Sequence, residues 1–325
     1  MTVMTGKFLI PLLIWMTCLV QNSAAQVPVI LDTDIGSDCD DAGALAVLNA
    51  LADRGEAKIL GVIYSSGANP YGVGVCDAID TYYGRGDVPL GQYPGSDVGD
   101  PMDHYSRVIA TDKSRFPHDV VDSATSLVKA YRKILEKQPD SSVTLITIGH
   151  PNGLRLLMRD PMSLSLIKRK VARWVAMAYA GTTPQRDWNF GRNGAENAID
   201  TVLRGWPTPR YFCSLGKTII TGNRQLPKTS QDNPVREAYR LWNNALQTGR
   251  YSWDPLTVLF AIRPAYFRVD TLGELVQNDE FQTWWNKEHD KSGEYRVTSF
   301  VMSRDSMENI VEGLMSASPK LRLKH

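Results

Sequence analysis

The stretch of sequence that decides the fold is "VILDTDIGSDCDDAGAL", residues 29–45, an apolar run that leads into a cluster of aspartates. Five aspartates, at positions 32, 34, 38, 40 and 41, fall within ten residues. Each carboxylate raises the free energy needed to ionise its neighbours, so a group of opposite charge should lie among them. The apolar run predicts a buried strand, and the aspartates predict a binding site where that strand ends.

Strand-like and helix-like patterns alternate on both sides of this stretch. Near-continuous apolar strands between helices are typical of a parallel sheet that is covered on both faces. We therefore predict an α/β protein with a mostly parallel, Rossmann-like open sheet and helices on both faces, in a single domain. The expected strands are 27–32, 57–66, 88–91, 141–149 and 172–181, and the expected helices are 40–51, 71–84, 120–137 and 152–160.

Polar segments follow three of these strands. They are the aspartate cluster after the first strand, "SSGANP" after the second, and "TIGHPN" near residue 147. Ligands of open parallel sheets bind at the carboxyl ends of the strands, so these three segments should converge on one pocket. The polar connection 93–118 is long enough to serve as a lid over it.

The N-terminal segment predicts a cleavable signal peptide over residues 1–25. Its apolar core, "FLIPLLIWMTCLV", is too short to span a bilayer, and small residues precede Gln26. An uncleaved membrane anchor is the alternative. We expect a mature catalytic domain over residues 26–325 that is secreted or periplasmic and has no further contact with a membrane.

The charge and the cysteine content exclude several classes of function. The chain has 36 basic and 35 acidic residues, and the signal segment removes only Lys7 from this balance. A neutral chain without a basic run lacks the cluster of positive charge that is typical of proteins that bind nucleic acid or an anionic membrane. The three cysteines beyond the signal segment, Cys39, Cys76 and Cys213, form neither a disulfide framework nor a zinc-binding pattern. A single bridge between two of them is left open.

Two structural readings of the aspartates compete with a metal site. Asp38 or Asp40 could cap the following helix, but capping leaves Asp32 and Asp34 unexplained. An EF-hand loop is rejected because its twelfth position, which needs a bidentate Glu, is Gly43. A hard cation such as Ca²⁺ fits a set of carboxylate and carbonyl oxygens, and water held beside a carboxylate can act as a hydrolytic nucleophile.

The aspartate stretch resembles a known family signature. "ILDTDIGSDCDDA" is similar to the N-terminal motif of the nucleoside hydrolases, whose usual form is D-x-D-x-G-x-D-D-A. This chain has two residues more than the usual form, Asp38 and Cys39, before the pair Asp40–Asp41.

Four later segments extend the resemblance along nearly the whole mature chain. They are "GANPYGVGVCDAI", "TLITIGHPNGL", "RDWNFGRNGAENA" and "YSWDPLTVLFAI". The resemblance implies that Asn69 contacts the ribose, that the Ile148 carbonyl binds calcium, and that Asp187 and Asn189 hold the ribose hydroxyls. It also implies that Asp254 completes the calcium site.

The resemblance implies calcium-dependent hydrolysis of the N-glycosidic bond of a ribonucleoside to ribose and free base. Such a site binds the sugar hydroxyls tightly and places water beneath the anomeric carbon. Asp34 would accept the proton of that water. The implied calcium ligands are Asp34, Asp41, Ile148 and Asp254, and the implied ribose contacts are Asp40, Asn69, Asp187 and Asn189.

The chain departs from the commonest family pattern at the leaving group. Many members carry a His directly before the late aspartate, where this chain has Trp253. We expect Trp253 to stack on the base, which predicts a preference for purine nucleosides. Packing roles for Trp253 and Trp188 are the alternative. His150 is a further candidate acid, although a lone His is more often a structural donor.

Two other functions stay open. A secreted nucleoside- or sugar-binding protein could keep the metal site without turnover. A phosphohydrolase of the haloacid dehalogenase type also has a strand that ends in D-x-D, but the further Ser/Thr, Lys and acidic pair of that class are not evident here. The expected partner is a small nucleoside, and the sequence leaves homo-oligomer formation open.

Overall fold

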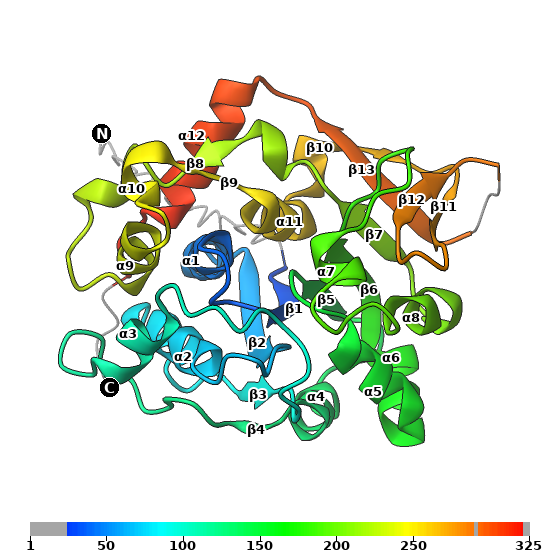
Figure 1. Cartoon of the computed structure of the whole chain (residues 1–325), viewed down its shortest axis with the longest axis horizontal. Helices are drawn as coiled ribbons and strands as arrows, with labels where there is room; N and C mark the ends of the chain where they lie inside the picture. The colour runs from blue at the N-terminus through cyan, green and yellow to red at the C-terminus, as the bar shows by residue number, and fades with distance from the viewer. Residues whose placement is uncertain (1–24, 289–291, 321–325) are drawn as a thin grey trace, which may run out of the picture.

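The computed structural model describes residues 25–288 and 292–320, and a nine-stranded sheet runs through the middle of the molecule (Figure 1). Its strand order is β10-β13-β7-β6-β5-β1-β2-β3-β4. Every neighbouring pair is parallel except β10 with β13. The prediction of a mostly parallel open sheet is therefore confirmed.

The strands of this sheet are β1 Val27–Thr33, β2 Ala57–Tyr64, β3 Leu90–Gln92, β4 Thr125–Ser126, β5 Val143–Thr147, β6 Val171–Met177, β7 Arg210–Cys213, β10 Phe267–Asp270 and β13 Glu294–Phe300. Two small antiparallel sheets pair β8 Ile220–Thr221 with β9 Arg250–Tyr251, and β11 Glu274–Gln277 with β12 Thr283–Asn286.

The α-helices are α1 Asp40–Asp53, α2 Gly72–Tyr82, α3 Ser106–Thr111, α4 Leu127–Leu135, α5 Asn152–Arg159, α6 Pro161–Lys170, α7 Trp188–Gly191, α8 Ile199–Gly205, α9 Pro234–Leu241, α10 Ala245–Thr248, α11 Trp253–Ile262 and α12 Arg304–Met315. Short 3₁₀ turns occur at Gly216–Thr218, Leu226–Lys228 and Pro264–Tyr266.

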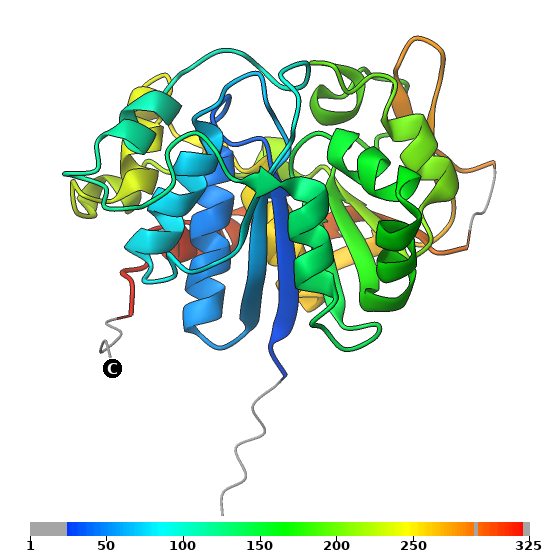
Figure 2. The same cartoon turned by 90° about the horizontal axis from the view of Figure 1, so that it is seen from below.

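Alternating side chains of each central strand enter two separate hydrophobic cores. In β1, Val29 and Leu31 join one core, whereas Ile30 joins the other. Successive side chains of a strand point to opposite faces, so a strand that is apolar at every position needs helices on both sides. Helices α1, α2, α9, α11 and α12 cover one face, and α4, α5, α6 and α8 cover the other (Figures 1 and 2).

The first helix is buried along most of its length. All residues of α1 from Asp40 to Leu51 are buried, because the helix packs against the sheet and contacts α11 and α12. Its N-terminus lies directly after the carboxyl end of β1. The aspartates of this connection are therefore held inside the molecule.

The segment between β3 and α4 differs from the prediction. The connection 93–118 contains the short helix α3, and the helix expected from residue 120 begins only at Leu127. The Asp77 carboxylate accepts hydrogen bonds from the backbone N–H groups of Asp119 and Val120, at 2.9 and 2.7 Å. The chain then pairs with β3 as β4 before it turns into α4. These tertiary hydrogen bonds override the local helical pattern.

The predicted signal peptide lies almost wholly within residues 1–24, outside the described residues. Among residues 25–288 and 292–320, we find no helix with the length and apolar character needed to cross a bilayer. Cys39, Cys76 and Cys213 are buried free thiols.

A buried carboxyl group in α2 predicts a pH dependence of stability. Asp80 is 1 % exposed, its Oδ1 accepts a hydrogen bond from Asn49 at 2.8 Å, and its Oδ2 has no partner. Burial raises the pKa of Asp80 to about 7, although the Asn49 hydrogen bond lowers it in part. Between about pH 4 and this pKa the unfolded chain has lost the proton and the folded chain keeps it. The free energy of unfolding therefore falls as pH rises, by up to about 1.4 kcal/mol per pH unit.

Asp80→Asn removes this contribution. We expect the variant to gain stability relative to the wild type as pH rises through this window. Urea unfolding of both proteins across the window, with a chelator in every sample, measures the difference. Parallel stability curves for the two proteins would show that Asp80 is ionised in the folded state.

Candidate active site

A cavity of about 390 Å³ opens at the carboxyl ends of the central strands. This volume falls within the range of about 300–1,000 Å³ that is usual for small-molecule sites. Its walls come from the segment after β1, the turn after β5, the loop after β6 and the start of α11. Eight of the predicted site residues line it: Asp34, Asp40, Asp41, Ile148, Asp187, Asn189, Trp253 and Asp254.

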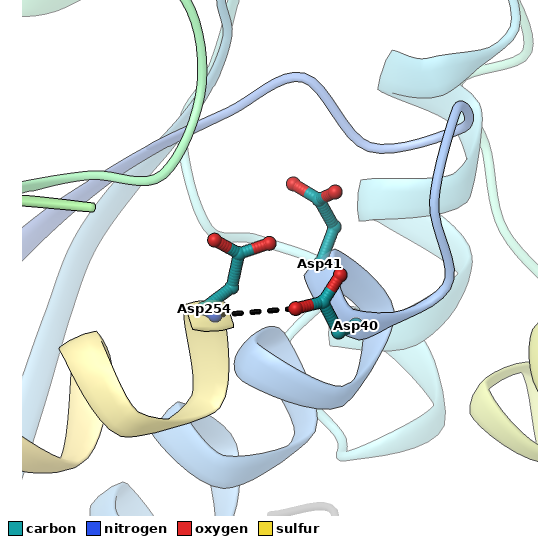
Figure 3. Close-up of side chains that lie close together, drawn as sticks. All are labelled: Asp40, Asp41 and Asp254. Atoms are coloured by element: carbon teal, nitrogen blue, oxygen red, sulfur yellow. Dashed lines mark hydrogen bonds between the residues drawn. The ribbon is translucent and has the colours of Figure 1, made fainter. Parts of the chain in front are cut away.

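Three buried carboxylates meet on the floor of this cavity. Asp40, Asp41 and Asp254 each offer an oxygen within 4.8 Å of the other two (Figure 3). The first two start α1 and the third lies in the first turn of α11, so both helix N-termini direct positive dipole ends at the cluster. Oδ2 of Asp40 accepts hydrogen bonds from the backbone N–H groups of Trp253 at 3.0 Å and Asp254 at 3.3 Å. Asp40 thus joins the starts of the two helices and does not cap α1, its own helix.

The electrostatics of the cluster favour a bound cation. Burial, followed by the charges of neighbouring aspartates, raises the pKa values of Asp40, Asp41 and Asp254 well above the usual range of a carboxyl group. Oδ1 of Asp254 is buried and has no hydrogen-bond partner. A divalent cation would satisfy this oxygen and neutralise the carboxylates, and oxygen ligands are those that hard cations prefer. The residues present therefore fit a metal site.

Asp34 faces the same cavity but is not a member of the three-carboxylate cluster. Its carboxyl group is close enough to the cluster for its charge to raise the pKa values of Asp41 and Asp254. Burial raises the pKa of Asp34 itself, and the neighbouring His150 lowers it in part. The side chain of Thr33 donates a 2.5 Å hydrogen bond to Oδ1 of Asp41, which fixes that carboxylate beside the end of β1.

The turn after β5 comes very close to the end of β1. A Cβ atom on Gly149 would lie 2.6 Å from the backbone nitrogen of Asp34, so only glycine fits there. This approach brings Ile148 to the cavity wall. Its backbone carbonyl accepts a 2.8 Å hydrogen bond from the side-chain amide of Asn189. A carbonyl oxygen has two lone pairs, so one acceptor position remains for a ligand.

Asp187 is buried and both of its carboxylate oxygens accept backbone hydrogen bonds. Oδ1 caps α7 by binding the N–H of Phe190 at 2.8 Å, and Oδ2 binds the N–H of Tyr179 at 2.9 Å. Asp187 therefore shapes the loop after β6 as well as lining the cavity.

The structure does not bring Asn69 to the cavity wall. Its side-chain Oδ1 accepts the N–H of Tyr71 in its own loop at 3.0 Å, and its Nδ2 donates to the Met102 carbonyl, in the connection after β3, at 3.4 Å. Asn69 is absent from the residues that line the cavity in the described part of the chain. Its ribose contact stays a prediction.

The two additional residues of the aspartate motif have a tertiary function that sequence reasoning missed. The carboxylate of Asp38 receives two hydrogen bonds from Arg250, one of them 3.0 Å long from Nε. The guanidinium group also lies over the ring of Trp242, 4.7 Å from its centroid. Cys39 packs in the core. The unbalanced charge of Asp38 was the available signal, but it did not identify a partner 212 residues away.

The remaining aspartate, Asp32, contacts a helix that packs on the sheet behind the site. It is buried, and its Oδ2 accepts a 2.7 Å hydrogen bond from the hydroxyl of Tyr131 in α4. Burial raises the pKa of Asp32 to about 7. The five aspartates thus have different neighbours and hydrogen-bond partners. Helix capping alone therefore does not explain why they cluster in this segment.

Two tryptophans contribute apolar surface to the cavity. Trp253 is half-buried and makes an edge contact with Tyr251, with ring centroids 6.4 Å apart. Trp188 also lines the cavity and is 45 % exposed, so it is not a core residue. Both rings are accessible to a ligand.

Comparisons with known proteins give a fold but no sequence family. No family model matches this chain, and no curated protein does. Two similar solved structures are an inosine-uridine preferring nucleoside hydrolase from Bacillus anthracis and a purine-preferring ribonucleoside hydrolase from Gardnerella vaginalis. They are 15 % and 16 % identical to this chain, and each match has a TM-score of 0.65 and covers 89 % of this chain and 99 % of the other.

A third similar structure is the type III effector protein XopQ complexed with adenosine diphosphate ribose. It is 14 % identical, with a TM-score of 0.64, and the match covers 91 % of this chain and 95 % of the other. The protein described here therefore has the α/β fold of the nucleoside hydrolases. At the end of its central strands it carries a buried aspartate cluster that fits a metal ion.

Proposed function

We propose that this protein hydrolyses the N-glycosidic bond of ribonucleosides in a calcium-dependent reaction, with purine nucleosides preferred. The observation that carries the proposal is the buried cluster of Asp40, Asp41 and Asp254, with Asp34 facing the same cavity. The nucleoside hydrolase fold supports this function over the phosphohydrolase alternative. The same fold supports the proposal that the partner of this protein is a small nucleoside-like ligand.

Asp34 is the proposed general base. Its burial raises the pKa of the carboxyl group, which makes its carboxylate a better proton acceptor once it is ionised. Asp34 lines the cavity, where its carboxylate would accept a proton from a water molecule beneath the anomeric carbon of the sugar. Asp40, Asp187 and Asn189 line the same cavity and are the proposed contacts of the ribose hydroxyls, with Asn69 as a further candidate.

Calcium is the proposed cofactor because the available ligands are oxygen atoms. The proposed ligands are the carboxylates of Asp34, Asp41 and Asp254 and the Ile148 carbonyl, with Asp40 beside them. The described residues that line the cavity include no histidine or cysteine, the ligands that softer metals favour. When bound, Ca²⁺ would supply positive charge that holds the oxygen atoms of substrate and water in place.

The base would lie against Trp253. An indole N–H is not acidic at neutral pH, so Trp253 cannot protonate the departing nitrogen as a histidine could. It can stack on the base, and a purine offers more overlap than a pyrimidine. The similar structures include both a purine-preferring and an inosine-uridine preferring hydrolase, so the proposed preference for purines rests on Trp253.

Trp253→Ala should lower kcat/KM for inosine and guanosine much more than for uridine. Stacking contributes about 1–3 kcal/mol per base, which corresponds to a loss of about 5- to 150-fold for the purines. Trp253→Phe keeps an aromatic face and should fall between the wild type and the alanine variant. Equal losses on purines and uridine would reduce Trp253 to a packing residue, and a wild type that prefers uridine would reject the stacking account.

A substrate panel tests the proposed function. The mature chain, residues 26–325, is incubated with Ca²⁺ and inosine, guanosine, adenosine, uridine or cytidine, and ribose release is measured. We expect release from the purine nucleosides first. Absence of ribose release from the whole panel would overturn the proposed activity on ordinary nucleosides.

A riboside-binding protein without turnover is the second candidate. The observation that favours it is the cavity wall, where the described residues include no histidine, the residue that most often acts as a general acid. Calorimetric titration of the same panel, together with adenosine diphosphate ribose, separates the two functions. Binding without base release would support the second candidate, and release would exclude it.

We also propose that the protein is exported after cleavage of residues 1–25. Protein recovered from the producing cell should then begin at or near Gln26, as N-terminal sequencing would show. A chain that retains Met1 would contradict export by this route.

A further inference from the structure

His150 is a fully buried residue that contacts two segments of the candidate site. It follows Gly149 in the turn after β5, and its side chain is 0 % exposed. Its Nε2 lies 3.2 Å from Oδ2 of Asp34, in charge-pair range but without hydrogen-bond geometry, and its Nδ1 forms a 3.2 Å hydrogen bond with the backbone carbonyl oxygen of Asn189. One imidazole therefore lies between the proposed general base and the loop that carries the proposed ribose contacts.

The imidazole does not reach the substrate cavity. Among the described residues, the cavity is lined by both of its neighbours, Asp34 and Asn189, but not by His150. A direct role as the acid for the leaving base, which the sequence left as a candidate, is therefore not supported by its position. Any effect of His150 on the reaction has to act through the groups that it contacts.

The backbone around His150 is held firmly in this place. Gly149 packs against the backbone at the end of β1, where a Cβ atom would lie 2.6 Å from the nitrogen of Asp34. On the opposite side, the side chain of Asn189 donates a 2.8 Å hydrogen bond to the Ile148 carbonyl, next to the turn. The backbone on the N-terminal side of His150 is thus fixed, which places the ring beside the Asp34 carboxylate.

Asp34 needs such support because it lies just beyond β1, in the connection to α1. Within the described chain, His150 is the basic side chain that lies within 4.0 Å of the Asp34 carboxylate. A general base contributes only when its carboxylate is within hydrogen-bond reach of the proton that it accepts. Partners that orient such groups typically change activity or metal affinity by about 10- to 100-fold when they are removed.

We propose that His150 is a positioning residue that holds the Asp34 carboxylate toward the cavity through Nε2 and anchors the Asn189 segment through Nδ1. This inference rests on the proposed function, because it gives Asp34 the role of the base. It predicts that loss of the Nε2 contact and loss of the Nδ1 contact have different effects on the reaction.

Two variants separate the two contacts. The carboxamide of a glutamine reaches the place of Nε2, and the carboxamide of an asparagine reaches the place of Nδ1. In His150→Asn the contact with Asp34 is lost, and we expect kcat to fall about 10- to 100-fold with KM little changed. In His150→Gln the contact with Asn189 is lost, and we expect KM to rise while kcat stays close to that of the wild type.

His118→Gln is the matched control. His118 is also buried, with both ring nitrogens near backbone carbonyl oxygens, those of Phe116 and Ala110, and it does not line the cavity. Like the His150 variants, His118→Gln should have a lower melting temperature, because a buried histidine is replaced. Unlike them, it should show neither the selective loss of kcat nor the selective rise of KM. If His150→Asn and His150→Gln change kcat and KM by the same factors, the positioning role is wrong.

Crystal structures of the two His150 variants provide a readout that is independent of turnover. We expect the Asp34 carboxylate to keep its position in His150→Gln and to turn away in His150→Asn. An unchanged Asp34 in His150→Asn would overturn the inference. If the wild type releases no base from any nucleoside, the proposed function fails, but the position of Asp34 in these structures still decides whether His150 positions it.

Discussion

Asp34→Asn should lower kcat for the best nucleoside substrate by about 10²- to 10⁴-fold, the usual contribution of a general base. The substitution keeps the size of the side chain but removes the proton acceptor. Asp34 is not a member of the cluster formed by Asp40, Asp41 and Asp254, so binding of Ca²⁺ should largely persist. Steady-state kinetics and calorimetric titration with Ca²⁺ measure the two effects separately.

Asp80→Asn is the matched control for this experiment. Asp80 is an equally buried aspartate with a raised pKa, but it lies in α2 and does not line the cavity. Its replacement should leave kcat unchanged at neutral pH. Wild-type turnover in Asp34→Asn would show that another group activates the water, and the proposed mechanism would be wrong.

Exhaustive removal of divalent cations should abolish turnover, and restored Ca²⁺ should recover it. The buried carboxylates of Asp40, Asp41 and Asp254 repel one another, and a bound cation removes this repulsion. At a Ca²⁺ concentration of about 100 times Kd, binding adds about 2.7 kcal/mol to the free energy of unfolding. This corresponds to an increase of about 5 °C in Tm.

Asp254→Asn tests the assignment of this increase to the cluster. The variant loses the carboxylate whose Oδ1 is buried without a partner, so Ca²⁺ should no longer raise its Tm. Asp80→Asn should keep the full increase. Full activity after chelation, or the same increase of Tm in Asp254→Asn, would contradict a metal site at this cluster.

The elements around the first strand could be predicted because their patterns are local. The apolar run of five residues in β1, 27–31, and the apolar helix α1 predict burial on all sides without knowledge of the segments that pack against them. The alternation of strands and helices gave the parallel sheet for a similar reason. The helix expected from residue 120 was wrong in its start because Asp77, from another helix, binds the backbone there.

The candidate site was predictable where residues follow strand ends or helix starts. Asp34, Asp41, Ile148 and Asp254 reach one cavity because β1 and β5 are neighbours and because α1 and α11 begin beside them. The adjacency of parallel strand ends makes such convergence a general property of open α/β sheets. The side-chain direction of Asn69 is not fixed by this rule, and the side chain binds Tyr71 in its own loop and Met102 in the connection after β3.

The sequence by itself determined the class of sheet, the strand end that carries the site and most of the residues gathered there. Only the tertiary structure decided which partner each polar group has. Asp38 pairs with Arg250 across 212 positions, Asp40 binds the start of α11, and His150 lies between Asp34 and the Asn189 segment. Local patterns record whether a position is buried or exposed. The choice among several possible partners for a buried charge depends on how distant segments pack together, which local patterns do not encode.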